Sequence, residues 1–285
     1  MNPSSKQQLP RPIINLLRRL RHTALLTLSP LDYLSRVINQ KTDFPPLHLR
    51  RHVGPLRTFE SSGAEFMNYL QLLGKLKPEE HVLDIGCGCG LMALYLKEYL
   101  HSDGYYAGID IHQPSIKWCQ KNIASERHNF LFVHTDILSA AYNPNGKHRG
   151  ETYQLPFEAQ SFDVILLKSV FTHLPPTEVD NYLGEIARLL KNDGRCLATF
   201  FLLNETQVDL DKQGKAALHF RYGEDDWRYV YEHSPESAAA YREGFVMDLM
   251  LKHHLVVTGI HYGRWSGRSD GLSFQDIIVI EKTMS

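Results

Sequence analysis

Short apolar runs alternate with helix-like segments through the middle of the chain. The runs lie at residues 82–85, 107–111, 130–137, 161–167 and 195–203. Apolar residues also recur at helical spacing over residues 176–190, which predicts a helix there. Strands that alternate with helices form a parallel sheet, so the pattern predicts an α/β fold. Runs at residues 255–261 and 274–280 predict a terminal antiparallel pair of strands.

Aromatic residues alternate with other residues on both sides of a polar turn at residues 223–226. They are Phe220, Tyr222, Trp227, Tyr229 and Tyr231. This period of two predicts a β-hairpin, and a helix is expected to follow over residues 235–253. The hairpin either covers an edge of the sheet or forms a wall of a ligand pocket, and the sequence leaves both open.

The first apolar run ends in Asp84 and a turn with glycines at positions 86, 88 and 90. Glycine is needed where φ is positive or where a ligand lies close to the backbone. The spacing differs from the Gly-x-Gly-x-x-Gly of dinucleotide-binding folds, and no Gly-Lys-Ser/Thr of a phosphate-binding loop follows. The turn therefore predicts a strand, a tight bend and a helix whose N-terminus faces a ligand. The two motifs that are absent argue against a dinucleotide or a nucleoside triphosphate as that ligand.

This turn resembles the first motif of the class I S-adenosylmethionine-dependent methyltransferases. Further motifs of that family are matched in order between about residue 62 and residue 203. The resemblance implies that the glycine turn wraps the methionine part of S-adenosylmethionine, that Asp110 binds the ribose hydroxyls, and that Asp136 lies near the adenine amino group. The cofactor-binding residues it implies are Asp84, Gly86, Cys87, Gly88, Gly90, Asp110, Ile111, Asp136, Ile137, Lys168 and Ser169.

The resemblance also implies the architecture of the chain. We expect a Rossmann-like sheet of seven strands, mostly parallel with an antiparallel last strand, and helices on both faces. Residues 56–285 are expected to form this domain, with the aromatic hairpin inserted at about residues 205–235. Residues 1–55 are expected to form an N-terminal helical extension. A chain of 285 residues suits one large α/β core of this kind.

Composition indicates which partners and which cellular compartment to expect. The net charge is −1, which argues against nucleic acid as a partner. The four cysteines show no Cys-x-x-Cys spacing, so we expect a reduced cytoplasmic protein without a metal site. No apolar run reaches the roughly 20 residues that span a bilayer, and no secretory signal pattern is present.

The N-terminal segment is basic and amphipathic. Residues 1–22 contain Lys6 and four arginines but no acidic residue, and apolar residues recur at helical spacing between positions 13 and 20. Residues 11–25 could contact an anionic membrane surface, and an arginine-rich, acid-poor start is also typical of a transit peptide. The favoured interpretation is a helix that packs on the core or on a second subunit of a homodimer.

Methyl transfer from a sulfonium is an in-line displacement, so the protein supplies positioning and, where required, a base. Ligands of open α/β sheets bind beyond the carboxyl ends of the strands. His173 is the leading candidate for the base, because imidazole titrates near neutral pH. The other candidates are Lys168 and Tyr262 for catalysis, and Phe171, Phe201, Trp227 and Arg264 for acceptor binding. An alternative acceptor site lies under the N-terminal helix and residues 51–57.

We therefore expect methyl transfer from S-adenosylmethionine to an oxygen or nitrogen of a small molecule, as in similar bacterial small-molecule methyltransferases. Three alternatives stay open: a methyltransferase acting on protein or RNA, aminopropyl transfer on the same scaffold, and a non-catalytic scaffold subunit. The chain lacks the Asn/Asp-Pro-Pro-Tyr/Phe motif of similar enzymes that methylate nucleobase amino groups, and has Lys168 and Ser169 there instead.

Overall fold

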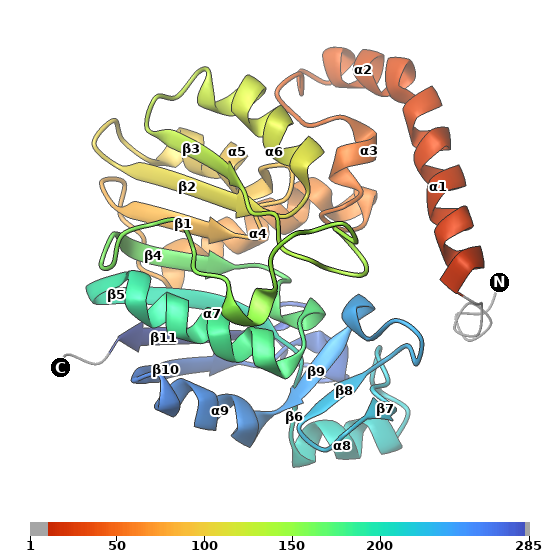
Figure 1. Cartoon of the computed structure of the whole chain (residues 1–285), viewed down its shortest axis with the longest axis vertical. Coiled ribbons are helices and arrows are strands. Elements are labelled where there is room, and N and C mark those ends of the chain that lie inside the picture. Colours follow the sequence, from red (N-terminus) through yellow and green to blue (C-terminus); the bar gives the residue numbers. More distant parts are fainter. Residues whose placement is uncertain (1–10, 283–285) are drawn as a thin grey trace.

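Seven strands form the main sheet in the computed structural model, which describes residues 11–282 (Figure 1). Their spatial order is β10–β11–β5–β4–β1–β2–β3. The bounds are β1 (His81–Ile85), β2 (Tyr105–Asp110), β3 (Phe130–His134), β4 (Phe162–Leu167), β5 (Leu190–Phe200), β10 (Leu255–His261) and β11 (Asp276–Lys282). Strands β1 to β5 pair in parallel, whereas β11 is antiparallel to both β5 and β10. The predicted sheet with an antiparallel last strand is confirmed.

Helices cover both faces of this sheet, as predicted. Helices α4 (Phe59–Leu72), α5 (Leu91–Tyr99) and α6 (Gln113–Cys119) share one core with the strands, and α7 (Pro176–Leu189) and α9 (Glu243–Lys252) share the other. Because successive strand residues face opposite sides, Val82 belongs to the first core and Leu83 to the second. Both side chains are fully buried, which explains why this strand reads as a continuous apolar run.

A second, smaller sheet lies beside β11 and α9 (Figure 1). It has the order β6–β9–β8–β7, with β6 (Leu202–Leu203), β7 (Tyr222–Gly223), β8 (Trp227–Tyr229) and β9 (Ala239–Arg242), and α8 (Glu205–Lys212) follows β6. β7 and β8 form an antiparallel hairpin, on which the rings of Tyr222 and Tyr229 stack. The helix predicted over residues 235–253 is wrong at its start, because residues 239–242 pair with β6 and β8 and the helix begins only at Glu243.

Asp276 joins the two sheets. It is 1% exposed at the start of β11, and its carboxylate accepts hydrogen bonds from Leu202 N (2.7 Å), Gly263 N (2.6 Å) and Trp265 Nε1 (2.8 Å). Burial raises the pKa of Asp276 to about 6, although these hydrogen bonds oppose the shift. The Trp265 ring is fully buried and packs on Phe201, so the carboxylate fixes a local aromatic core.

Replacing Asp276 with alanine is expected to lower the free energy of unfolding by about 3 kcal/mol or more, because three buried donors lose their acceptor. A loss of that size corresponds to a fall in melting temperature of roughly 6–12 °C for a domain of this length. Thermal denaturation followed by circular dichroism measures the effect. The control is Asp270→Ala on the exposed neighbouring loop, and equal melting temperatures for the two variants would contradict the assignment.

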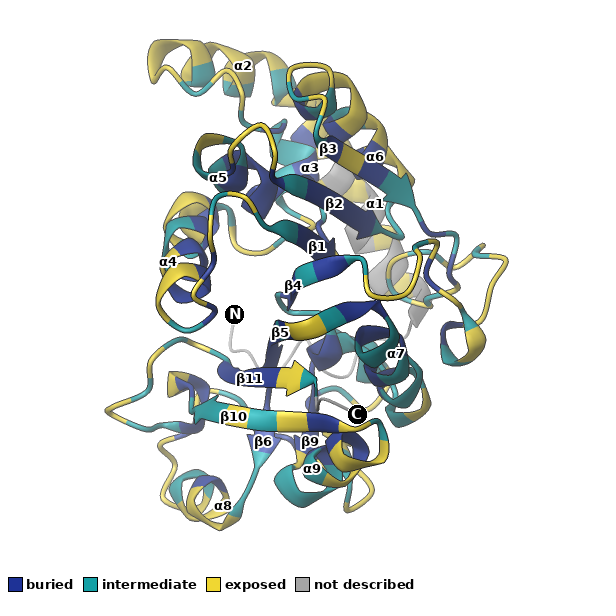
Figure 2. Ribbon diagram, turned by 90° about the vertical axis from the view of Figure 1, so that its left-hand side faces the viewer, coloured by how far each residue is buried: buried dark blue, intermediate teal, exposed yellow. Residues whose placement is uncertain are grey.

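Three α-helices precede α4 in the described part of the chain: α1 (Arg11–Thr27), α2 (Ser29–Ile38) and α3 (Leu47–Arg50). The described side chains of α1 are those of residues 13, 16, 20, 21 and 23–27, and residues 1–10 of the predicted extension lie outside the described part. No residue of α2 is buried, and Figure 2 shows this helix as almost entirely exposed. The packing expected on the core or on a second subunit concerned residues 1–22, not α2, and stays a prediction. Within residues 11–282, no helix has the length and apolar character needed to cross a membrane.

Ion pairs around Asp32 hold α2 in place. The Asp32 carboxylate pairs with Arg36 on the same helix and with Arg50 of α3, and it accepts a hydrogen bond from Leu47 N (3.1 Å). Arg36 also donates to the carbonyl of Phe44 (2.7 Å). The helix is thus fixed to the segment before the methyltransferase-like domain, although its outer face has no neighbour among the described residues.

Candidate functional site

A cavity opens at the carboxyl ends of the central strands, where β1 lies between β2 and β4. The chain runs from β1 to β2 and β3 on one side and returns to β4 and β5 on the other, and such a switch point is where open α/β sheets bind ligands. The cavity encloses about 170 Å³. Its lining includes the predicted residues Gly86, Gly88, Asp110, Ile111, Ile137, Lys168, Ser169 and His173.

The glycine turn follows β1 and has positive φ at all three glycines, 75° at Gly86, 55° at Gly88 and 81° at Gly90. The amides of Gly86 and Cys87 donate to the carbonyl of Ile109, which fixes the turn against β2. A Cβ at Gly88 would lie 2.6 Å from Val53 Cγ2, because the segment that contains Val53 packs directly on the turn. Backbone conformation and close packing both require glycine here.

Asp110 ends β2 and lies in the cavity lining. Its carboxylate accepts hydrogen bonds from Gly88 N (2.8 Å) and His112 N (2.7 Å), and so joins the glycine turn to the start of α6. Burial raises the pKa of Asp110, and the two amide hydrogen bonds oppose that shift. A carboxylate held in this way by backbone donors keeps a fixed orientation towards a ligand.

Asp84 and Cys87 lie behind the turn and outside the lining of this cavity. Asp84 is 2% exposed and accepts a hydrogen bond from Tyr106 Oη (2.8 Å), and burial raises its pKa to about 7. The Cys87 thiol is buried against Gly108, and burial raises its pKa. Gly90 caps α5 in the left-handed conformation. Asp84, Cys87 and Gly90 shape the turn, and none of the three lines the cavity.

The end of β4 forms the opposite wall. Lys168 is half-buried, and its ammonium has no hydrogen-bond or ion-pair partner among the described residues. Burial lowers the pKa of Lys168, while Asp84 and Glu65 oppose the shift. Ser169 has a φ of 60°, a strained value for a non-glycine residue, and its hydroxyl donates to Gln275 Oε1 (2.8 Å).

His173 follows on a 3₁₀ turn (Phe171–His173) and lines the same cavity. Its Nδ1 lies 2.7 Å from the carbonyl oxygen of Glu236, which fixes the tautomer with the proton on Nδ1. No hydrogen-bond partner of Nε2 is present within residues 11–282. Burial lowers the pKa of His173, so the imidazole is neutral at pH 7 with Nε2 free to accept a proton.

A larger groove of about 1,450 Å³ adjoins the first cavity. It lies between the segment from α1 to α4 and the residues that precede β11, with Arg51 and Glu65 on one side and Arg264 and Phe274 on the other. Both spaces are lined by His52, Val53, His112, Tyr142, Lys168, Ser169 and His173. His52 belongs to residues 51–57, the alternative acceptor site of the sequence analysis. His112 and Tyr142 were not assigned to the site, because only the fold brings them to the end of β4.

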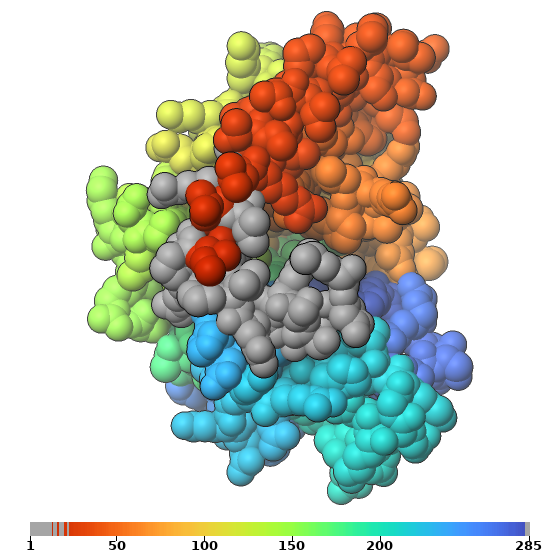
Figure 3. Space-filling view, turned by 90° about the vertical axis from the view of Figure 1, so that its right-hand side faces the viewer, coloured from red at the N-terminus to blue at the C-terminus, as the bar shows by residue number. Residues whose placement is uncertain are grey.

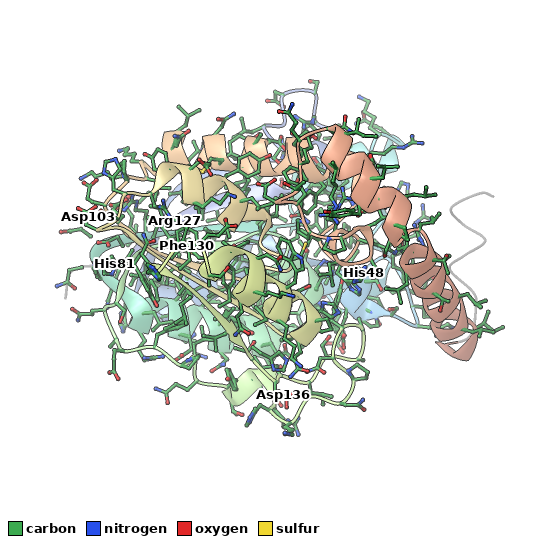
Figure 4. All side chains as sticks on the ribbon, turned by 90° about the horizontal axis from the view of Figure 1, so that it is seen from above. His48, His81, Asp103, Arg127, Phe130 and Asp136 are labelled. Carbon is green, nitrogen blue, oxygen red and sulfur yellow. The ribbon has the colours of Figure 1, made fainter. Side chains whose placement is uncertain are left out.

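Asp136 follows the carboxyl end of β3, the end of the sheet at which the cavity lies, but it is not part of the cavity lining. It accepts a hydrogen bond from Asn143 Nδ2 (3.1 Å), and Lys147 Nζ lies 3.7 Å away. Asn143 lowers the pKa of Asp136. Figure 4 shows Asp136 and His48 far from His81 and Asp103, which mark the opposite end of the sheet. Ile137 next to it does line the cavity.

Four predicted acceptor-side residues lie outside the lining of both spaces, and the interpretation of each is corrected. Phe171 is fully buried and stacks on Phe200, and Phe201 belongs to the Trp265 core. Trp227 pairs across the small sheet with Tyr241 and packs on Tyr229. Tyr262 donates to Glu243 Oε2 (3.0 Å), with Arg268 over its ring. Aromatic side chains are as useful in a core as in a pocket, so residue type alone did not separate the two.

Known proteins share both the sequence motifs and this fold. The model of the methyltransferase domain family matches residues 83–198. A phthiotriol/phenolphthiotriol dimycocerosates methyltransferase of Mycobacterium ulcerans is 32% identical over 157 residues, 54% of this chain and 49% of that protein. A demethylmenaquinone methyltransferase of Lactobacillus johnsonii is 26% identical over 121 residues, 42% of this chain and 43% of that protein. The chain thus spans about half the length of these curated relatives.

Solved structures agree on the fold. The 1,6-didemethyltoxoflavin-N1-methyltransferase of Burkholderia thailandensis, solved with 1,6-didemethyltoxoflavin and S-adenosylhomocysteine, superposes with a TM-score of 0.53 at 17% identity and covers 97% of this chain and 91% of that chain. The PH0226 protein of Pyrococcus horikoshii gives a TM-score of 0.53 at 17% identity, over 79% of this chain and 91% of that chain. Residues 83–198 therefore match the methyltransferase domain family, and the chain shares its fold with S-adenosylmethionine-dependent methyltransferases.

Proposed function

We propose that the protein transfers a methyl group from S-adenosylmethionine to an oxygen or nitrogen of a small molecule that binds in the larger groove. The observation that carries the proposal is the wall of Lys168, Ser169 and His173, which lines both spaces at once. A methyl donor in the first cavity and an acceptor in the groove would meet at this wall. In-line displacement requires the acceptor atom and the methyl carbon to be held in contact and aligned.

The residues of the first cavity fit the methyl donor. The glycine turn offers backbone without side chains, and Asp110 presents a carboxylate suited to the ribose diol. The donor supplies an electrophilic methyl carbon. Methyl transfer would form a bond between the acceptor atom and that carbon as the carbon–sulfur bond broke, and would release S-adenosylhomocysteine. His173 Nε2 takes the proton that the nucleophile loses, because Nδ1 already donates a hydrogen bond to the Glu236 carbonyl.

Relatives support a small-molecule acceptor. The two curated relatives are named for a phthiotriol/phenolphthiotriol dimycocerosate and for demethylmenaquinone, and the Burkholderia enzyme was solved with 1,6-didemethyltoxoflavin. A macromolecular acceptor would call for an open basic surface, whereas the groove mixes Arg51 and Arg264 with Glu65. A scaffold subunit would not need the carboxylate of Asp110 or the turn that it holds.

The first test follows methyl-tritiated S-adenosylmethionine into an extract separated into small molecules and macromolecules. Transfer into the small-molecule fraction is expected, and transfer only into protein or RNA would support the macromolecular alternative. No transfer into either fraction, although S-adenosylhomocysteine binds, would favour the scaffold function. Aminopropyl transfer is tested separately with decarboxylated S-adenosylmethionine as the donor, from which it would release methylthioadenosine.

The acceptor site is tested with arginine variants. Arg51→Gln and Arg264→Gln are each expected to lower methyl transfer about tenfold or more, the effect of losing a hydrogen bond from a charged donor. The affinity for S-adenosylhomocysteine should stay within about threefold, because both arginines lie outside the first cavity. The matched control is Arg268→Gln, on the same segment but outside both linings. Equal losses for all three variants would refute the groove as the acceptor site.

A further inference from the structure

The outer face of α2 is apolar and has no neighbour among the described residues. Leu31, Leu34 and Ile38 are 65%, 55% and 71% exposed, and their spacing places them on one side of the helix. On α1, exposed apolar side chains recur at similar spacing, at Ile13, Leu16 and Leu20. Soluble proteins seldom expose contiguous apolar faces of this extent without a partner.

The orientation of this face is set by contacts on its other side. Asp32 pairs with Arg36 and Arg50 and so holds α2 against α3, and Leu25 is the one buried residue among the described side chains of α1. The described residues of the two helices lie on the surface, mostly in the upper half of Figure 3, where they are drawn as red spheres. The apolar side chains are therefore presented outward by a fixed scaffold.

Charge favours an anionic partner. Residues 1–31 contain Lys6, Arg11, Arg18, Arg19 and Arg21 and no acidic residue, whereas the whole chain has a net charge of −1. The rest of the chain is consequently net negative, so the basic charge is concentrated in the part of the sequence that contains α1. Apolar residues combined with arginines on amphipathic helices suit the interface of an anionic bilayer, into which the helices insert without spanning it.

The larger groove reaches α1, the first of these two helices. Thr23 of α1 lines the groove together with His48 and Arg51 of the α3 segment, and Figure 4 shows His48 beside the N-terminal helices. A surface that bound α1 would therefore lie close to the side of the groove that Thr23 lines.

We propose that α1 and α2 bind the surface of an anionic phospholipid bilayer and hold the entrance of the larger groove next to it. The first part depends only on the helices. The second part rests on the proposed function and adds a substrate class to it: an acceptor dissolved in the membrane, which enters the groove from the bilayer.

Vesicle co-sedimentation tests the binding surface. The full chain is expected to bind vesicles of phosphatidylcholine mixed with phosphatidylglycerol, to bind phosphatidylcholine alone much less, and to dissociate at high salt. Leu31→Ser/Leu34→Ser/Ile38→Ser should lower the partition coefficient at least about tenfold, because three apolar side chains no longer leave water. Arg18→Gln/Arg19→Gln/Arg21→Gln should lower it about fivefold per arginine. The matched control is Leu72→Ser/Leu251→Ser, which changes two equally exposed leucines elsewhere.

Three results would overturn the proposal: wild-type protein that ignores anionic vesicles, a triple serine variant that binds like wild type, or a control that loses as much binding. Sedimentation velocity without lipid measures the oligomeric state. It therefore tests whether a second copy of the chain covers the apolar face of α2 instead of a bilayer. A dimer that the triple serine variant abolishes, without vesicle binding, would assign the face to self-association. Titration with S-adenosylhomocysteine in the same preparations keeps this outcome separate from the proposed function, since vesicle binding needs no methyl donor.

Discussion

Asp110→Ala is expected to weaken the binding of S-adenosylhomocysteine about thirty- to a thousandfold, the effect of losing roughly 2–4 kcal/mol from a charge-assisted pair of hydrogen bonds. Asp110 lies in the cavity at the end of β2, and its carboxylate fixes Gly88 and His112. The substitution removes the group that we assign to the ribose diol and also releases the glycine turn. Isothermal titration calorimetry measures the affinity.

The same variant is expected to be less stable without ligand. Two backbone amides lose their acceptor, at a cost of about 1–3 kcal/mol for each that stays buried. Stability and affinity therefore have to be measured together. Loss of stability with unchanged affinity for S-adenosylhomocysteine would show that Asp110 only holds the turn.

Asp84→Asn is the matched control, because it alters a neighbouring buried carboxylate that does not line the cavity. Affinity for S-adenosylhomocysteine should change by less than about threefold. The folded-state pKa of Asp84 is raised to about 7, so ionisation disfavours the folded state. Its effect on stability is thus absent below the ordinary pKa of an aspartate and grows as the pH rises towards 7. The asparagine variant should lose that part of the pH dependence.

The central strands could be predicted from the sequence because they are buried on both faces. Val82 and Leu83 point to opposite sides of the sheet and both are fully buried, so the apolar run carries the information by itself. The glycine turn was predictable for a similar local reason. Its three positive φ angles exclude most side chains, whatever the rest of the chain does.

Where tertiary packing overrides local preference, prediction failed. Ala238, Ala239 and Ala240 favour a helix by propensity, yet Ala239 and Ala240 are fully buried in a strand between β6 and β8. The alternating aromatic residues indicated the hairpin. They did not indicate which other residues pack on this region. Trp265, far along the chain, packs on Phe201 and Phe220 and makes this region a core.

The larger groove was beyond local prediction, because its two sides come from distant parts of the chain. Arg51 and Glu65 precede β1, whereas Arg264 and Gln275 lie between β10 and β11. No periodicity or motif links these segments. Only the position of β11 between β5 and β10 brings the residues before it to the end of β4, next to Ser169.

His173→Ala is expected to lower the rate constant of methyl transfer about 10²- to 10⁴-fold if the acceptor must lose a proton as it is methylated. The affinity for S-adenosylhomocysteine should change much less. Burial lowers the pKa of His173 below its ordinary value, so the base is neutral at pH 7 and is lost only as the pH falls through that lowered pKa. The wild-type rate should therefore decline in acid, and the difference between wild type and variant should be largest at neutral pH and shrink as the pH is lowered.

Two further variants separate the base from a positioning residue. The amide of His173→Asn can take the place of Nδ1 and donate to the Glu236 carbonyl, whereas that of His173→Gln reaches the place of Nε2. Neither amide accepts a proton at neutral pH. If His173 only anchors the residues around Glu236, the asparagine variant should recover most of the activity. If Nε2 takes the proton, asparagine and glutamine should both stay as slow as alanine, and the acidic limb of the pH–rate profile should disappear in all three. Full activity in His173→Asn at neutral pH would exclude His173 as the base and leave Lys168, the half-buried ammonium on the same wall, to be examined in its place.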